Sequence, residues 1–235
     1  MSFCFYDEIK FTIYLAIIEA CTFLRFVFSG GKKVFWCAMA YICARQNLPN
    51  MQISIETERL LIRPLALSDD KGMFELDSDP EVHRFLGRKP VQTIDECRKV
   101  IEFVRQQYID FGIGRWAVTE KENGDFVGWT GFKMMKDMVN GHTGHYDFGY
   151  RLVRRFWGKG YATESGKAAL EYGVRSLKFA DIYGMTDVDN VASRRVLEKL
   201  GFRYVETFAY DAEPNWRDAG APTTWYRWED RLQHQ

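Results

Sequence analysis

The sequence has little proline, no excess of either charge and almost no cysteine after its first fifty residues. Only 6 prolines and 19 glycines occur among 235 residues, of which 46% are hydrophobic and 16% aromatic. This composition excludes a disordered, collagen-like or low-complexity chain and predicts a compact protein with a sizeable core. The 32 basic residues balance the 32 acidic ones, so the charge gives no reason to expect a nucleic acid as partner.

Cysteine is the scarcest reactive residue in the main body of the chain. Four of the five cysteines precede Asn50, which leaves only Cys97 in the remainder. A disulfide framework is therefore excluded there, and we expect a reducing, cytoplasmic compartment. His142 and His145 have no cysteine or acidic residue at ligand spacing, so we expect surface histidines and no metal site.

The first fifty residues differ in composition from the rest. Residues 11–28 (FTIYLAIIEACTFLRFVF) are nearly long enough to cross a bilayer, but Glu19 and Arg25 interrupt the apolar run, and each is costly in lipid. We interpret residues 1–50 as an apolar extension that arises from a mis-assigned start. In this interpretation the protein itself begins at Met51. A membrane anchor is the less favoured alternative. Residues 51–235 are predicted to form one domain.

The main body alternates between strand and helix patterns. Thr93 and Glu96 fit a capping box at a helix start, and Asn123-Gly124 is a hairpin signal between two strands. The order predicts an α/β (α+β) protein with a mixed sheet and helices on its faces. The predicted strands are 53–65, 115–120, 126–134, 146–153, 181–186, 202–208 and 223–228, and the predicted helices are 68–76, one from Thr93 to Gly112, one that follows residue 161, and 190–200.

A glycine-bearing loop joins one of these strands to a helix. It consists of Trp157, Gly158, Lys159, Gly160, Tyr161 and Ala162. The first amides of a helix have no partners within the helix and attract phosphate, and glycine lets an anion approach the backbone. Two glycines are equally compatible with an ordinary strand-to-helix turn. The loop has neither the Walker spacing nor the dinucleotide-binding spacing, which argues against an ATPase or a dehydrogenase.

The chain contains the segment FWGKGYATES and, some 30 residues later, the segment DNVASRRVLEKLGF. Together these two segments resemble the GCN5-related N-acetyltransferases, and within them the branch that acetylates ribosomal protein N-termini (RimJ/RimL type). The resemblance covers about 53–228. It implies a mostly antiparallel central sheet with helices on both faces and a splayed strand pair that receives coenzyme A. Trp157 stands where the family usually has glutamine or arginine.

The resemblance also assigns residues to the cofactor. It implies that acetyl-CoA, the co-substrate, is bound by Leu152 and the loop from Trp157 to Ala162, with Asn190 and Ser193 beside the pantetheine and thioester. Asn190 is equally well explained as a helix N-cap. Many relatives carry a tyrosine at the position of Leu197, where it protonates the departing thiolate. Leucine cannot do so, which leaves Ser193, a water or no acid at all.

The implied reaction is direct attack of an amine on the thioester in a ternary complex. A backbone donor near Leu152 would stabilise the oxyanion, and a base must deprotonate the incoming ammonium. Asp147 is the first candidate, because its strand is the splayed one, and Glu164 and Glu206 are alternatives. Each of the three is also explained as an ordinary surface acid, or for Glu164 as an acid that favours the helix dipole.

We therefore predict an acetyl-CoA-dependent N-acetyltransferase whose acceptor is a protein N-terminus or a small-molecule amine. A non-catalytic acyl-CoA sensor or partner-binding module is the alternative, and the leucine at position 197 is the feature that keeps it open. No nucleic acid or membrane partner is expected, and a homodimer stays open.

Overall fold

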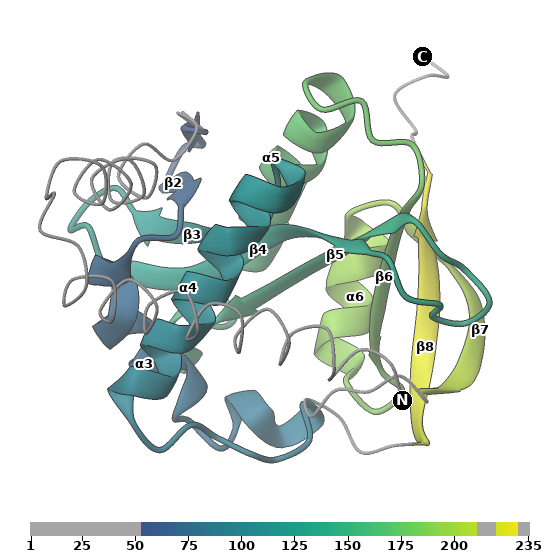
Figure 1. The fold of residues 1–235 in the computed structure, drawn as a ribbon, viewed down its shortest axis with the longest axis horizontal. Coiled ribbons are helices and arrows are strands. Elements are labelled where there is room, and N and C mark those ends of the chain that lie inside the picture. Colours follow the sequence, from purple (N-terminus) through teal and green to yellow (C-terminus); the bar gives the residue numbers. More distant parts are fainter. Residues whose placement is uncertain (1–52, 211–219, 230–235) are drawn as a thin grey trace, which may run out of the picture. The chain divides into compact units, whose positions relative to one another are not determined.

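The computed structural model describes residues 53–210 and 220–229, which form one eight-stranded sheet with helices (Figure 1). The strand order is β1-β2-β3-β4-β5-β6-β8-β7. The predictions for residues 1–50 lie outside the described residues. The strands are β1 (Ile55–Glu56), β2 (Leu60–Pro64), β3 (Arg115–Glu120), β4 (Phe126–Met135), β5 (His145–Leu152), β6 (Ile182–Asp187), β7 (Phe202–Tyr210) and β8 (Ala221–Trp228). The α-helices are α3 (Asp70–Asp77), α4 (Ile94–Phe111), α5 (Tyr161–Arg175) and α6 (Val191–Lys199), and the 3-10 helices are η1 (Leu67–Asp69), η2 (Val82–Phe85) and η3 (Arg154–Phe156).

Every neighbouring pair of strands is antiparallel except β5 and β6. These two strands run parallel and pair at only two positions, Tyr146 with Ile182 and Asp147 with Tyr183. On its other edge β5 pairs with β4 over eight positions. The edge of β5 that faces β6 is therefore open beyond Asp147, which confirms the predicted mostly antiparallel sheet and places its splay.

The two faces of the sheet carry different helices. Trp116, Phe132 and Phe148 point to one face, where their rings pack edge to face with centroids 5.9 Å and 5.7 Å apart. Helix α5 crosses this face closely, because a Cβ added to its Gly173 would lie 2.7 Å from the Phe132 ring. Since side chains alternate along a strand, Arg151 points to the other face, where it meets Asp77 at the end of α3.

Most predicted elements occur where the sequence placed them. Helix α4 has Thr93 as N-cap and Gly112 in the left-handed conformation after its last residue. The run 53–65, predicted as one strand, is divided, because residues 57–59 turn the chain so that Ile55 pairs with Ile62. The short helix η2 was not predicted from the sequence.

Candidate active site

The glycine loop leads directly into the first turn of α5. Gly158 and Gly160 both have positive φ, and Gly160 is the N-cap of α5. The first bonds of the helix are donated by the amides of Thr163 and Glu164 to the Gly160 carbonyl. Within the described part of the chain, the amides of residues 158–162 donate no hydrogen bond. This arrangement fits a diphosphate, which accepts such bonds at a helix N-terminus.

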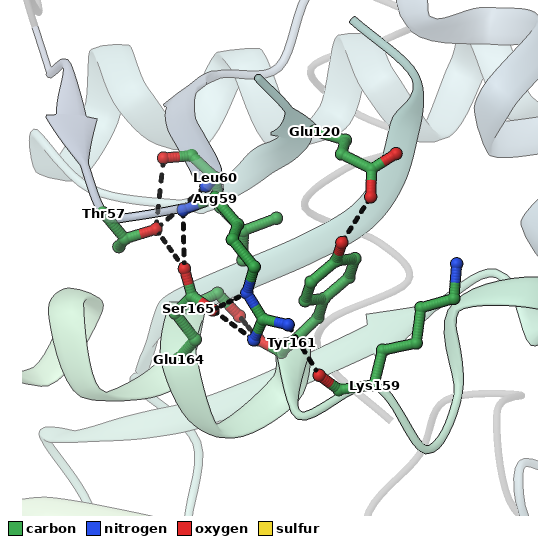
Figure 2. A network of polar contacts seen from close by, with 8 residues as sticks. All are labelled: Thr57, Arg59, Leu60, Glu120, Lys159, Tyr161, Glu164 and Ser165. Carbon is green, nitrogen blue, oxygen red and sulfur yellow. Dashed lines mark hydrogen bonds and ion pairs between the residues drawn. The ribbon is translucent and has the colours of Figure 1, made fainter. Parts of the chain in front are cut away.

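A polar network from the first strands holds this loop in place (Figure 2). The Arg59 guanidinium donates to Glu164 Oε2 from Nε at 2.8 Å and from Nη2 at 2.5 Å, and to the Lys159 carbonyl at 3.1 Å. Thr57 Oγ1 and the Arg59 amide donate to Glu164 Oε1. Burial alone would raise the pKa of Glu164, but the bonds from Thr57 and Arg59 lower it below its ordinary value. The Glu164 carboxylate therefore stays ionised and bound to Thr57 and Arg59. Because its oxygens are engaged in these bonds, Glu164 is a poor candidate for the base.

Two side chains of the loop are held by hydrogen bonds to residues outside it. Trp157 is 47% exposed, and its indole nitrogen donates to the Leu152 carbonyl at 2.8 Å. The Tyr161 hydroxyl donates to Glu120, while Arg59 lies over the Tyr161 ring at 4.5 Å. The Lys159 ammonium points away from this network (Figure 2) and forms no ion pair with a described residue. The loop thus offers amide hydrogens and the ammonium of Lys159, which lies over the Phe156 ring at 5.0 Å.

The open edge of β5 supplies further donors. The Tyr146 amide donates to the Asp181 carbonyl, so it points toward β6, and the Val153 amide donates to Val127 beside β4. Because successive amides of a strand point to opposite edges, those of Tyr150 and Leu152 face the opening. An extended chain running from the glycine loop toward Asp147 would meet both amides.

Helix α6 covers this opening on the α5 face. Asn190 Oδ1 accepts from the Ser193 amide at 3.1 Å, which makes Asn190 the N-cap of α6. Ser193 Oγ accepts from the Tyr150 hydroxyl at 3.3 Å. Leu197 is 2% exposed and packs against Gly184 of β6. The structure therefore brings Ser193 to the splay and buries Leu197 in the core.

Asp147 lies at the vertex of the splay, on the face opposite Ser193. Its carboxylate accepts from Arg115 Nη2, and Arg115 Nη1 also donates to the carbonyls of Asp147 and Gly131. Lys133 is opposite Asp147 on β4, and burial lowers its pKa although the charge of Asp147 opposes that shift. The other candidate base, Glu206, is exposed on β7 and accepts from Asn140.

Several site residues were not found from the sequence. Arg59 and Arg115 act on partners 105 and 32 residues away, and no local pattern indicates such contacts. Tyr150 had a usable signal, because it stands two residues before Leu152 on the strand that was expected to splay. The prediction that His145 is a surface histidine was wrong. His145 is 2% exposed and lies between Tyr183 and Trp225, with ring centroids 5.2 Å and 5.3 Å away.

The described residues contain no group of three or more histidines, cysteines or acids placed to hold a metal ion. In the same part of the chain, none of the helices has the length and apolar character that a membrane span requires.

An open strand edge leading to free amides at a helix start is the binding geometry of an acyltransferase that uses coenzyme A esters. The family model described as acetyltransferase (GNAT) domain matches residues 59–203. The chain belongs to this family.

Individual relatives agree with this assignment. The chain is 30% identical over 150 residues to "Uncharacterized N-acetyltransferase p20" of Bacillus licheniformis, which covers 64% of this chain and 82% of the relative. It is 31% identical over 169 residues to "FsC-acetyl coenzyme A-N(2)-transacetylase" of Aspergillus fumigatus, covering 69% and 71%. A solved RimL ribosomal L7/L12 alpha-N-protein acetyltransferase in complex with coenzyme A has the same fold, with a TM-score of 0.62, 18% identity and coverage of 74% and 97%.

The protein is thus an N-acetyltransferase that uses acetyl-CoA as acetyl donor, and the mixed, mostly antiparallel fold is that of its family. The predicted fold, enzyme class and co-substrate are confirmed. The roles assigned to individual site residues, and the acceptor, stay predictions.

Proposed function

We propose that this enzyme transfers the acetyl group of acetyl-CoA directly to a primary amine that enters the splay from the face of Asp147. The diphosphate binds the amides of residues 158–162, and Lys159 adds charge. The pantetheine arm follows the open edge at Leu152, with Trp157 and Asn190 bordering its path. The Tyr150 amide donates to the thioester oxygen as the tetrahedral intermediate forms.

This proposal rests on two neighbouring sets of backbone groups that have no partner among the described residues: the open edge of β5 and the amides at the start of α5. The ladder between β5 and β6 ends at Asp147, and the amides at the start of α5 have no acceptor among the described residues. One extended ligand with an anionic end satisfies both. Asp147 is held by Arg115 at the vertex, where it can accept a proton from the ammonium before attack.

The names of two relatives support two kinds of acceptor. One names an N(2) position of FsC, and the other names the alpha-amine of a ribosomal protein. Both names specify a nitrogen as the acceptor atom, which supports N-acetylation and leaves a protein N-terminus and a small molecule as the two acceptor classes. We place the reaction in the cytoplasm, and self-association into a homodimer is compatible with it.

The test is an acceptor screen on the purified protein. Coenzyme A release from acetyl-CoA is measured with a panel of small amines and with peptides that have free N-termini. We expect acetyl transfer to at least one of them, confirmed by mass spectrometry of the product. Tight binding of acetyl-CoA without turnover on any acceptor would instead favour the sensor function.

A second measurement tests Asp147 itself. Asp147→Asn removes the proton acceptor, so we expect kcat to fall at least tenfold, most strongly at low pH where the amine is an ammonium. The matched control is Asp137→Asn, because Asp137 is exposed beyond the end of β4. Binding of acetyl-CoA and the melting temperature are measured in parallel, and a pH profile that matches the unsubstituted enzyme would remove Asp147 as base.

A further inference from the structure

Tyr150 lies on the part of β5 along which the reactive end of acetyl-CoA is expected, and its hydroxyl contacts Ser193. The donor enters at the glycine loop and its arm follows the edge of β5 toward the vertex, where pairing with β6 begins at Asp147. Its reactive end must therefore lie between Leu152 and Asp147. Tyr150 is in the middle of this interval, and its side chain points to the α6 face, where its hydroxyl meets Ser193.

The two hydroxyls are close enough to exchange a proton. Tyr150 Oη donates to Ser193 Oγ at 3.3 Å. Among the described residues, Ser193 Oγ donates to no acceptor, although its amide is fixed by Asn190. The serine proton is thus available to a group in the opening. The distance of 3.3 Å is longer than the 2.7–2.8 Å typical of two hydroxyls, so the hydrogen bond between them is weak.

We propose that Tyr150 donates through Ser193 to the coenzyme A sulfur and so supplies the proton for the departing thiolate. This inference rests on the proposed function. Tyr150 acts through another residue and is a positioning residue and proton source, whereas Ser193 touches the sulfur. Together, Ser193 and Tyr150 would protonate the departing thiolate. Leu197, which is buried and has no hydroxyl, cannot do so.

The step balances as follows. The amine nitrogen forms a bond to the carbonyl carbon, and the carbon–sulfur bond breaks with its electron pair on sulfur. Sulfur takes the Ser193 hydroxyl proton, Ser193 takes the Tyr150 proton, and solvent returns one proton to Tyr150. The proton lost by the amine leaves to solvent by way of Asp147 on the other face of the sheet.

The surroundings of Tyr150 suit this role. Burial raises its pKa to about 12, so the hydroxyl keeps its proton at neutral pH. Its nearest ring neighbour is Phe148, with centroids 6.5 Å apart. Among the described residues, the Tyr150 hydroxyl forms a hydrogen bond with Ser193 and with no charged side chain.

The experiment compares Tyr150→Phe and Ser193→Ala with Tyr146→Phe in the full chain. Tyr146 is on the same strand and face but stacks on Phe179 with centroids 3.7 Å apart, away from the open edge. The first readout is the pKa of the thiol of bound coenzyme A, from the ultraviolet absorbance of the thiolate against the complex with desulfo-coenzyme A. We expect Tyr150→Phe and Ser193→Ala to raise this pKa and Tyr146→Phe to leave it unchanged.

The second readout is turnover. We expect kcat to fall at least tenfold in Tyr150→Phe while the dissociation constant of coenzyme A changes less than twofold. Ser193→Thr, which keeps the hydroxyl, should recover activity that Ser193→Ala loses. Because both residues form one chain, the double variant Tyr150→Phe/Ser193→Ala should be no slower than Ser193→Ala alone.

The inference is overturned if Tyr150→Phe leaves both the thiol pKa and kcat as in the unsubstituted protein, or if the effects of the two substitutions multiply. Failure of the proposed function looks different. In that case the unsubstituted enzyme acetylates no amine, whereas the thiol pKa still reports whether the two hydroxyls act on the sulfur.

Discussion

At the scale of single residues, the loop depends on Gly160 and Arg59 in different ways. Gly160 has a φ of 81°, a left-handed conformation that costs other residues about 1–2 kcal/mol. Arg59 neutralises Glu164, whose carboxylate would otherwise repel a diphosphate arriving at the same helix end. Gly160 thus permits the backbone conformation of the loop, and Arg59 removes the repulsion that Glu164 would exert on an anion.

Replacing Gly160 with valine should lower the affinity for coenzyme A at least tenfold, because the loop must change conformation and its amides no longer converge. Isothermal titration with coenzyme A measures this. The control is Gly124→Val, in the hairpin between β3 and β4, since Gly124 has a similar φ of 77°. We expect the control to lose stability but to keep its affinity. Unchanged binding by the Gly160 variant would contradict the assignment of the loop.

At the scale of elements, an ion pair connects α3 to the strand with the open edge. Asp77 accepts from Arg151 Nη1 at 2.6 Å, with the two side chains 6% and 21% exposed. Burial alone would raise the pKa of Asp77, but the charge of Arg151 and the hydrogen bond that it donates hold this pKa below its ordinary value of 3.8. The ion pair joins β5 to α3 on the face opposite α6. On the other face, the Tyr150 hydroxyl joins β5 to Ser193 of α6.

Asp77→Asn should lower the free energy of unfolding by about 3 kcal/mol at neutral pH, because Arg151 loses its partner. Since the folded pKa is depressed, the stabilisation is complete above the ordinary pKa and is lost as the pH falls through the folded value. Urea unfolding at several pH values should therefore show the difference shrinking below about pH 4. Asp70→Asn is the control, because its partner Arg98 is half exposed and such pairs contribute about 0–1 kcal/mol. If both variants lost the same free energy of unfolding, the Asp77–Arg151 pair would contribute no more than an exposed ion pair, and the prediction would be wrong.

The elements themselves were largely predictable from the sequence, and the site only in part. Periodicity and caps placed α4 and α6, and turn residues separated β3 from β4, because these signals are local. The turn at residues 57–59 was missed, since it is fixed by Glu164 on a distant helix. The glycine loop was predictable from its motif, whereas the hydroxyl pair of Tyr150 and Ser193 requires the packing of α6 on the sheet.

At the scale of the whole molecule, the described residues form an eight-stranded sheet whose first strand, β1, begins at Ile55. The family match begins at residue 59, and the first strand pairs within the described part. A protein that starts at Met51 should therefore have the same melting temperature within about 2 °C and the same kcat as the full chain. Thermal unfolding and the acetyl transfer assay measure this, and loss of folding in the shorter protein would assign residues 1–50 a structural role.

The sheet is least connected at the place where its chemistry is proposed. Two backbone pairs join β5 to β6, against eight that join β5 to β4. A substrate lying in the gap therefore bridges two parts of the sheet that otherwise share little backbone bonding. Acetyl-CoA should act as a temporary structural component as well as a reactant, so that β1–β5 and β6–β8 unfold more cooperatively while it is bound than after the product has left.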